Sequence, residues 1–146
     1  LPALAAAAGL RGPVDEGRIA LLGARDLDPL ERAALEASPV AVLAPERLRG
    51  DLGALDGALG RAAAGGPVYL HIDVDVLDPA EMPGVVYPTP GGLSLPELEA
   101  LLRTVRARGA PAAVTLTAVN LADGHEEAIL DAAVRVARAA LAEPSG

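Results

Sequence analysis

Short apolar runs alternate with amphipathic stretches along the whole chain. Four apolar runs have the composition and length of buried strands. They are residues 18–23, 40–43, 68–76 and 112–119. Four stretches between and after them have the hydrophobic period of helices. They are residues 28–37, 51–64, 94–108 and 123–142. Strands and helices that alternate through short turns predict an α/β fold, a doubly wound parallel sheet of about four strands with flanking helices.

Capping residues mark where two of these helices begin. Asp28 precedes Pro29 and stands three residues before Glu31, so it predicts an N-cap with Pro at the first helical position. Ser94 and Glu97 repeat the capping-box spacing. Residues 79–93 hold four Pro and three Gly, which predicts a stiff, ordered loop at the end of a strand, where function is often found.

Charged residues interrupt the third apolar run at one place. His71, Asp73 and Asp75 are two residues apart, so we expect all three side chains on the same side of the strand. Neighbouring carboxylates repel each other, and each needs a partner once it is removed from water. A divalent cation at the C-terminal end of the strand provides that partner. In the alternative interpretation, Asp73 and Asp75 lie in an exposed loop and cap backbone amides.

Composition excludes several classes of function. The net charge of −8 gives no basic stripe for phosphates, and the only aromatic residues are Tyr69 and Tyr87, so we expect no nucleic-acid partner. The chain has no Cys and no Lys, which excludes thiolate chemistry and Schiff-base chemistry. The lack of Lys also argues against a phosphatase that uses Asp73 and Asp75 as nucleophile and acid.

The first residues give no targeting signal. The apolar start at residues 1–8 is too short to span a bilayer and lacks the basic segment of a signal peptide, so we expect a cytoplasmic protein with no membrane partner. The chain begins with Leu1 and its only Met is Met82, which suggests a fragment or a processed chain.

The stretch from residue 71 to residue 92 resembles the third signature of the arginase, agmatinase and formiminoglutamase family, the ureohydrolases. The family pattern is roughly Ser-x-Asp-x-Asp-x-x-Asp-Pro, three residues, Pro-Gly-x-Gly-Thr-Pro, two residues and Gly-Gly. Here residues 71–79 read His-Ile-Asp-Val-Asp-Val-Leu-Asp-Pro, residues 83–88 read Pro-Gly-Val-Val-Tyr-Pro, and residues 91–92 are Gly-Gly. His71, Val86 and Tyr87 depart from the pattern, and the last two alter the loop near the expected substrate.

A second stretch extends the resemblance. Residues 19–27 look like the family's apolar strand that ends in Gly-x-Arg, here Gly23-Ala24-Arg25. The resemblance covers nearly the whole chain but only the C-terminal half of the family's fold. The family signatures Gly-Gly-Asp-His and Asp-Ala-His-x-Asp do not occur here. We therefore expect residues 1–146 to be the C-terminal part of a single arginase-like domain with a three-layer, doubly wound sheet.

The resemblance implies a hydrolase with two Mn²⁺ ions, which share a hydroxide that attacks a guanidinium carbon and releases urea. On this basis Asp73 and Asp75 are the metal ligands that this chain contributes, and no catalytic residue is assigned. Asp78 is expected to cap amides of the loop. His71 is expected to be a packed, hydrogen-bonded residue in preference to a ligand, and His125 to be exposed.

One departure bears on the substrate. Family enzymes that take arginine or agmatine carry a Glu after the last strand, in a context like Glu-Val-Asn-Pro, and here that position is Ala118 in Ala-Val-Asn-Leu. A cationic substrate would lose an ion pair. The chain is then expected to be part of an enzyme for linear guanidino or amidine C–N bonds, inactive without the N-terminal half. The alternative is a non-catalytic relative that serves as an assembly or regulatory subunit.

Family topology also predicts a gap in the sheet. The strand with Asp-Ala-His-x-Asp lies, in that fold, between the counterparts of residues 68–74 and 18–22. Without it the sheet would have a gap and two bare apolar edges. We therefore expect a partner, either the missing N-terminal half or further copies of the chain.

Overall fold

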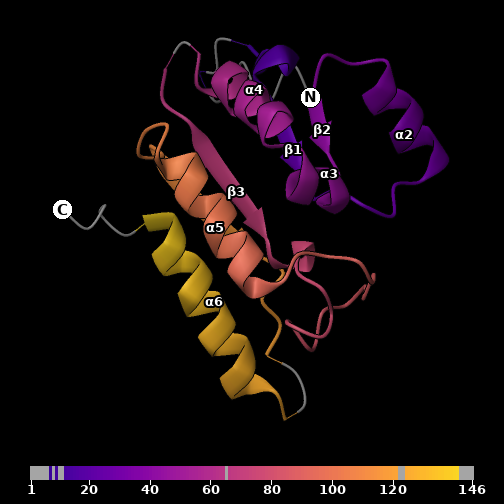
Figure 1. The fold of residues 1–146 in the computed structure, drawn as a ribbon, viewed down its shortest axis with the longest axis vertical. Helices are drawn as coiled ribbons and strands as arrows, with labels where there is room; N and C mark the ends of the chain where they lie inside the picture. The colour runs from indigo at the N-terminus through magenta and orange to yellow at the C-terminus, as the bar shows by residue number, and fades with distance from the viewer. Residues whose placement is uncertain (1–6, 8, 10–11, 65, 122–123, 142–146) are drawn as a thin grey trace.

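The computed structural model describes residues 7, 9, 12–64, 66–121 and 124–141. Strands and helices alternate as the hydrophobic pattern predicts (Figure 1). In chain order the elements are η1 (Glu16–Arg18), β1 (Ala20–Leu22), α2 (Pro29–Glu36), β2 (Ala41–Leu43), α3 (Pro45–Gly50), α4 (Leu52–Ala63), β3 (Tyr69–Asp73), η2 (Val74–Val76), α5 (Leu95–Arg106), β4 (Ala113–Thr117) and α6 (Glu126–Leu141). The two η elements are single 3₁₀ turns.

Both predicted capping boxes are confirmed. The Asp28 carboxylate accepts the N–H groups of Leu30 and Glu31 at 2.7 and 2.9 Å, and the Glu31 carboxylate accepts the Asp28 N–H at 3.2 Å. Ser94 and Glu97 form the same reciprocal pair at the start of α5. Residue 123, where the last helix was predicted to begin, lies outside the described residues.

Helix α3 was not predicted, because six residues are too few to show a hydrophobic period. It begins with Pro45 after an extended residue and has no side-chain cap. Asp51 ends this helix and caps the next one, accepting the Ala54 N–H at 2.8 Å. In α4, Leu55 and Leu59 are buried, whereas Leu52 is 74% exposed.

The four described strands form two separate parallel pairs. Strand β1 pairs with β2, and β3 pairs with β4 in a register that runs from Tyr69 opposite Ala113 to Asp73 opposite Thr117. Among the described residues, β1 and β3 are not joined by a strand pairing. The gap predicted between these two strands is therefore confirmed.

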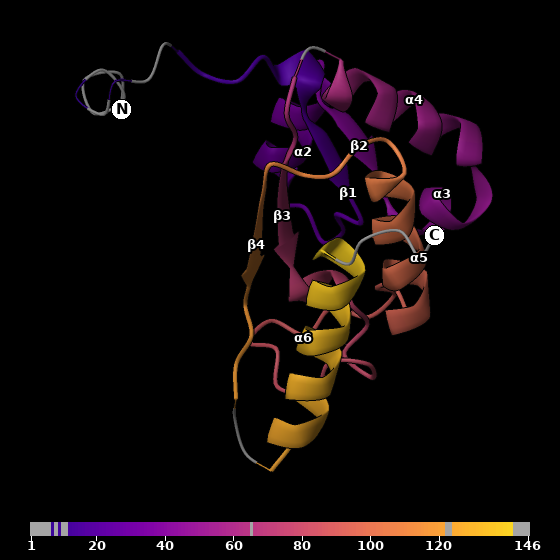
Figure 2. The same ribbon diagram turned by 90° about the vertical axis from the view of Figure 1, so that its left-hand side faces the viewer.

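The helices α3, α4, α5 and α6 lie together on one side of the strands (Figure 2). The main core fills the space between β3 and the pair α5 and α6, and its fully buried members include Val74, Leu77 and Val136. No described helix is both long enough and apolar enough to cross a bilayer. A cytoplasmic location stays a prediction.

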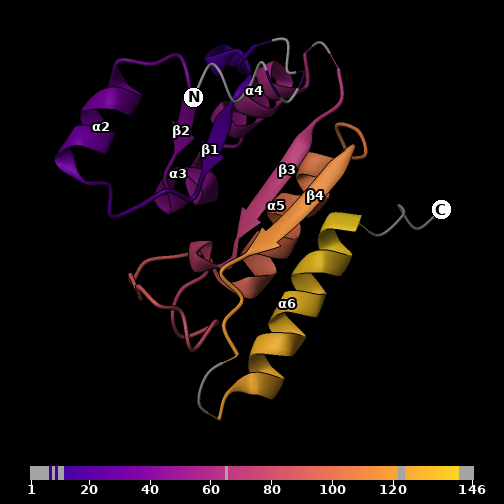
Figure 3. The same cartoon turned by 180° about the vertical axis from the view of Figure 1, so that it is seen from behind.

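The other side of the β3–β4 pair is bare within the described part of the chain. Tyr69 is 60% exposed, and His71 and Asp73 are exposed on the same face, whereas Ile72 between them is buried. Figure 3 shows this face toward the viewer, with α5 and α6 behind the strands. The expectation of a buried strand therefore holds for one face only within the described residues.

After β3 the chain makes a loop and returns to its own starting point. The Asp78 N–H donates to the Leu93 carbonyl at 2.9 Å, and the Leu93 N–H donates to the Val76 carbonyl at 2.9 Å. A Cβ added to Gly92 would lie 2.5 Å from the Leu77 carbonyl carbon and from the Asp78 nitrogen. Only glycine allows two backbone segments to approach this closely.

We predict that Gly92→Ala destabilises the protein by at least about 2 kcal/mol, because the backbone of Leu77 and Asp78 must move apart. Gly60→Ala is the matched control, since a Cβ there meets nothing within 4 Å and the residue lies inside helix α4. That change should raise the free energy of unfolding by about 0.5–1 kcal/mol. Urea unfolding measures both, and equal effects of the two substitutions would contradict the packing described for Gly92.

Candidate metal centre

Asp73 is the last residue of β3 and terminates the strand. Its Oδ1 accepts the Asp75 N–H at 3.0 Å, and the chain then turns through the 3₁₀ segment η2. Aspartate favours such a turn because its short side chain bonds the amide two residues on. Asp75 therefore does not continue the strand alternation, and the expected common face for His71, Asp73 and Asp75 holds only for the first two.

Asp75 lies partly buried within the turn. Its Oδ1 is buried and has no hydrogen-bond partner among the described residues. Burial raises the pKa of Asp75, the neighbouring Asp73 carboxylate raises it further, and the Arg25 guanidinium opposes both effects. A buried carboxylate oxygen without a partner is costly, and a bound cation removes that cost. The donor chemistry at this position therefore fits a divalent metal ion.

Asp73 combines features of both interpretations of the sequence. One oxygen caps a backbone amide, as the loop interpretation expects. The residue is nevertheless exposed at the strand end, beside the unpartnered oxygen of Asp75. Within the described residues no group of three or more His, Cys, Asp or Glu side chains is placed to hold a metal ion. Asp73 and Asp75 thus supply a partial donor set.

His71 joins a polar ladder on the bare face. Its Nδ1 lies 3.4 Å from the Tyr69 hydroxyl and its Nε2 lies 3.3 Å from the Thr117 hydroxyl. The Tyr69 hydroxyl also donates to Thr115 Oγ1 at 2.9 Å. The predicted hydrogen bonding of His71 is confirmed, but the predicted packing is wrong, because the side chain is exposed. His125 is exposed, as expected.

Asp78 fixes the loop that follows, as predicted. Its Oδ1 accepts the Ala80 N–H at 3.0 Å and its Oδ2 accepts the Gly91 N–H at 2.9 Å. These backbone hydrogen bonds, with Ala80 first, lower the pKa of Asp78. The side chain therefore joins both ends of the loop and is occupied by backbone amides.

Arg25 also holds this loop, a role that the sequence did not predict. Its Nε and Nη2 donate to the Thr89 carbonyl at 3.1 and 2.6 Å. Its two terminal nitrogens also donate to the carbonyls of Val76 and Leu77, at 3.4 and 3.1 Å. The only signal in the sequence was the Gly-x-Arg of the resemblance, since backbone acceptors more than fifty residues away leave no pattern.

Ala118 follows β4 at the same end of the sheet as the two acids, because Asp73 pairs with Thr117. Its φ of 61° is in the left-handed region, which is uncommon for a residue other than glycine. Asn120 then donates from Nδ2 to the Gly84 carbonyl at 3.1 Å, which connects this segment to the long loop. Tyr87 in that loop is 79% exposed.

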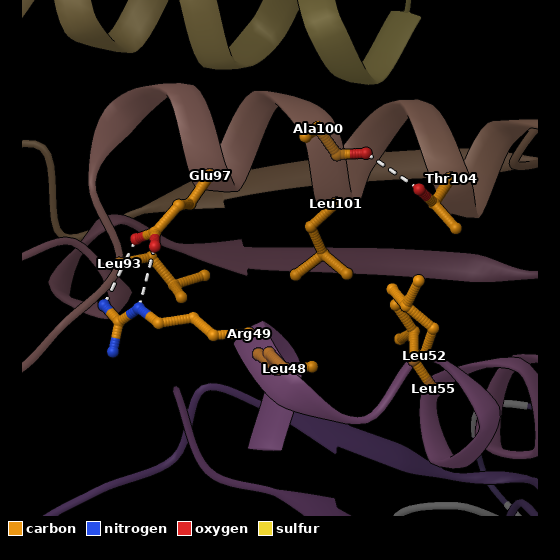
Figure 4. Close-up of a pocket in the computed structure, with 9 residues that line it drawn as sticks. All are labelled: Leu48, Arg49, Leu52, Leu55, Leu93, Glu97, Ala100, Leu101 and Thr104. Atoms are coloured by element: carbon orange, nitrogen blue, oxygen red, sulfur yellow. Dashed lines mark hydrogen bonds and ion pairs between the residues drawn. The ribbon is translucent and has the colours of Figure 1, made fainter. Parts of the chain in front are cut away.

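On the helical side, Arg49 holds the far end of the loop. Its guanidinium donates to the Glu97 carboxylate at 2.7 and 3.1 Å and to the Gly92 carbonyl at 2.7 Å. The pair lies at one end of a cavity of about 290 Å³ between α3, α4 and α5 (Figure 4). The cavity is lined by Leu48, Arg49, Leu52, Leu55, Leu93, Glu97, Ala100, Leu101 and Thr104.

Comparison with known proteins decides the family. A model of the family described as Arginase family matches residues 4–142. The chain belongs to the arginase family. The resemblance seen in the sequence and the arginase-like α/β fold are both confirmed.

Individual relatives agree with this assignment. An arginase of Schizosaccharomyces pombe is 34% identical over 118 residues, which cover 78% of this chain and 36% of the relative. A proclavaminate amidinohydrolase of Streptomyces clavuligerus is 56% identical over 39 residues, 27% of this chain and 12% of the relative. The crystal structure of a Bacillus subtilis arginase superposes with a TM-score of 0.78 at 26% identity, covering 93% of this chain and 48% of that one. The chain thus spans about half the length of that arginase.

The Arg49–Glu97 pair predicts a pH dependence of stability. The hydrogen bond from Arg49, with that from the Ser94 amide, lowers the pKa of Glu97 from 4.5 to about 2. A lowered folded-state pKa stabilises the fold above pH 4.5, and this stabilisation is lost as the pH falls towards 2. We predict that Glu97→Gln lowers the unfolding free energy at pH 7 by about 1 kcal/mol or less, since the side chains are more than a third exposed.

The difference between wild type and Glu97→Gln should shrink as urea unfolding is repeated from pH 5 down to pH 2.5. Glu127→Gln, at an exposed position in the first turn of α6, is the control and should give no such trend. If the difference in unfolding free energy between the two proteins does not change with pH, the charge of Glu97 contributes nothing to stability.

Proposed function

We propose that Asp73 and Asp75 are ligands in a binuclear Mn²⁺ centre of a ureohydrolase that cleaves a C–N bond of a linear guanidino or amidine substrate. The observation that carries this proposal is the buried, unpartnered Oδ1 of Asp75 beside the exposed Asp73 carboxylate. Membership of the arginase family supports the metal and the reaction class. Carboxylates are ligands suited to Mn²⁺.

Bound divalent metal supplies an activated water at neutral pH, because it lowers the pKa of that water. In this chain Asp73 and Asp75 would bind the metal through their carboxylates. Asp78 would not, because both of its oxygens accept backbone amides of the loop. Two carboxylates are too few for a metal pair. We infer that the remaining ligands come from outside this chain, from an N-terminal half of the domain or from another copy.

Two observations support the proposed substrate class: the residue at position 118, and the kinds of enzyme that the chain is similar to. Arginases and a proclavaminate amidinohydrolase are among the similar proteins. Ala118 carries no carboxylate to pair with a cationic guanidinium, at the end of the sheet where Asp73 lies. We therefore propose that the substrate's cationic group, where it has one, is held by residues other than position 118.

The second candidate function is a non-catalytic arginase relative that serves as an assembly or regulatory subunit. It is favoured by Ala118 and by the two changes in the signature loop, Val86 and Tyr87, which are 65% and 79% exposed. Such a subunit would retain the fold without hydrolysing any guanidino compound. The two candidates are separated by urea release from a panel of guanidino and amidine compounds. It is measured with the complete protein, meaning this chain together with the N-terminal half or further copy that supplies the remaining ligands.

We predict that Asp73→Asn and Asp75→Asn each weaken Mn²⁺ binding by the complete protein at least about tenfold, because each removes a charged ligand. Asp78→Asn is the matched control: it weakens two loop caps and should lower stability while Mn²⁺ affinity stays within about threefold. Chelator competition measures the affinity and thermal unfolding the stability. Unchanged Mn²⁺ affinity in both ligand variants would rule out this centre.

Residues 1–146 alone should bind Mn²⁺ weakly, because two carboxylates hold a hard ion poorly. Titration of this chain by itself measures that affinity. Tight binding of two ions would contradict the inference that ligands from elsewhere complete the site.

Ala118→Glu tests the substrate inference. A carboxylate at the end of β4 should lower KM for arginine or agmatine by about tenfold or more, because a desolvated ion pair is restored. Ala118→Gln is the control, with similar size and no charge, and should leave KM close to that of the wild type. A KM that Glu and Gln change equally would show that charge at position 118 does not select the substrate.

A further inference from the structure

We propose that Arg25 is a positioning residue for the metal ligand Asp75, and that it acts by joining the turn behind that ligand to the long loop. This inference rests on the proposed function of Asp75. Arg25 belongs to the segment after β1, and the residues it contacts follow β3. Its contacts therefore connect the two strand pairs that share no pairing within the described residues.

The acceptors of Arg25 are three backbone carbonyls. Two belong to Val76 and Leu77, the residues directly after Asp75, and the third belongs to Thr89 in the loop. Val76 is also the acceptor for the Leu93 N–H, so one carbonyl is bonded by both the loop's return and the guanidinium. Because the acceptors are main-chain atoms, these bonds fix the path of the backbone that carries Asp75.

The turn needs such support. Segment η2 is a single 3₁₀ turn closed by the Leu77 N–H on the Val74 carbonyl, and short 3₁₀ turns have poor hydrogen-bond geometry. Asp75 sits inside it with a buried oxygen that has no described partner. A relaxed turn would shift the backbone that carries this carboxylate and so change where its oxygens lie.

The sequence before Arg25 brings it into place. Gly23 has a φ of +82°, and a Cβ there would overlap Val76, so glycine allows the end of β1 to lie against the turn. Asp26 has a φ of 56°, and its carboxylate accepts a bond from the Thr89 hydroxyl at 3.3 Å. Two consecutive side chains thus hold Thr89: the Arg25 guanidinium bonds its carbonyl, and the Asp26 carboxylate bonds its hydroxyl.

Lysine cannot replace Arg25, because its single ammonium cannot donate to three carbonyls in the planar geometry of a guanidinium. We predict that Arg25→Lys weakens Mn²⁺ binding by the complete protein by roughly 10- to 100-fold, as the loss of ligand-orienting contacts does elsewhere. The same variant should speed amide hydrogen exchange at Leu77, Gly91 and Leu93 in the metal-free protein.

Arg49→Lys is the matched control. Arg49 holds the same loop through the Gly92 carbonyl and Glu97, on the helical side of the fold. Arg49→Lys should lower the midpoint temperature of unfolding and leave Mn²⁺ affinity within about threefold of the wild type. Thermal unfolding without metal verifies that each variant folds, and Arg25→Gln replaces Arg25→Lys if the latter does not.

The outcomes separate this inference from the proposed function. Mn²⁺ affinity and exchange rates that match the wild type in a folded Arg25 variant would overturn the positioning role. Equal losses of affinity in the Arg25 and Arg49 variants would overturn it as well, because the effect would then be one of general stability. If the wild type binds no Mn²⁺, the proposed function fails, and faster exchange in Arg25→Lys still establishes that Arg25 fixes the turn.

Discussion

The site depends on the chain's return at Leu93 to the backbone it left at Leu77. This short parallel bridge closes a loop whose ends are fixed by two backbone hydrogen bonds, and every other attachment of the loop builds on that closure. The absence of a side chain at Gly92 makes the approach possible. Asp78 then spans the loop from within, while Arg25 and Arg49 hold it from opposite sides. The two metal-binding candidates lie immediately before this closed loop, and of these residues Arg25 bonds the carbonyls of Val76 and Leu77, which follow Asp75.

Local signals in the sequence predicted the elements well. Capping boxes at Asp28 and Ser94 lie where the spacing indicated, because an N-cap depends only on residues within one turn. The role of Asp78 was also local, since aspartate bonds amides a few residues away. Helix α3 escaped prediction because its six residues are too few to show a period.

Predictions that depend on contacts between distant parts of the chain were less complete. The strand alternation was extended to Asp75, but the Asp73 side chain bonds the Asp75 amide and ends the strand first. His71 was expected to be packed, and nothing in a single strand reveals which of its faces another part of the fold covers. Arg25 was recognised only as part of a motif, because its acceptors are carbonyls that any residue provides.

The bare face of the β3–β4 pair has a consequence for how the chain meets its surroundings. The hydroxyl and imidazole groups of Tyr69, His71, Thr115 and Thr117 are already engaged with one another. The side chains of this exposed face are thus bonded to one another across β3 and β4. The edge of β3 nearest β1 is different, because its main-chain donors and acceptors have no strand beside them in the described structure. Within the described residues, the main-chain groups left for a further strand to pair with therefore lie along this edge of β3, in the plane of the strands.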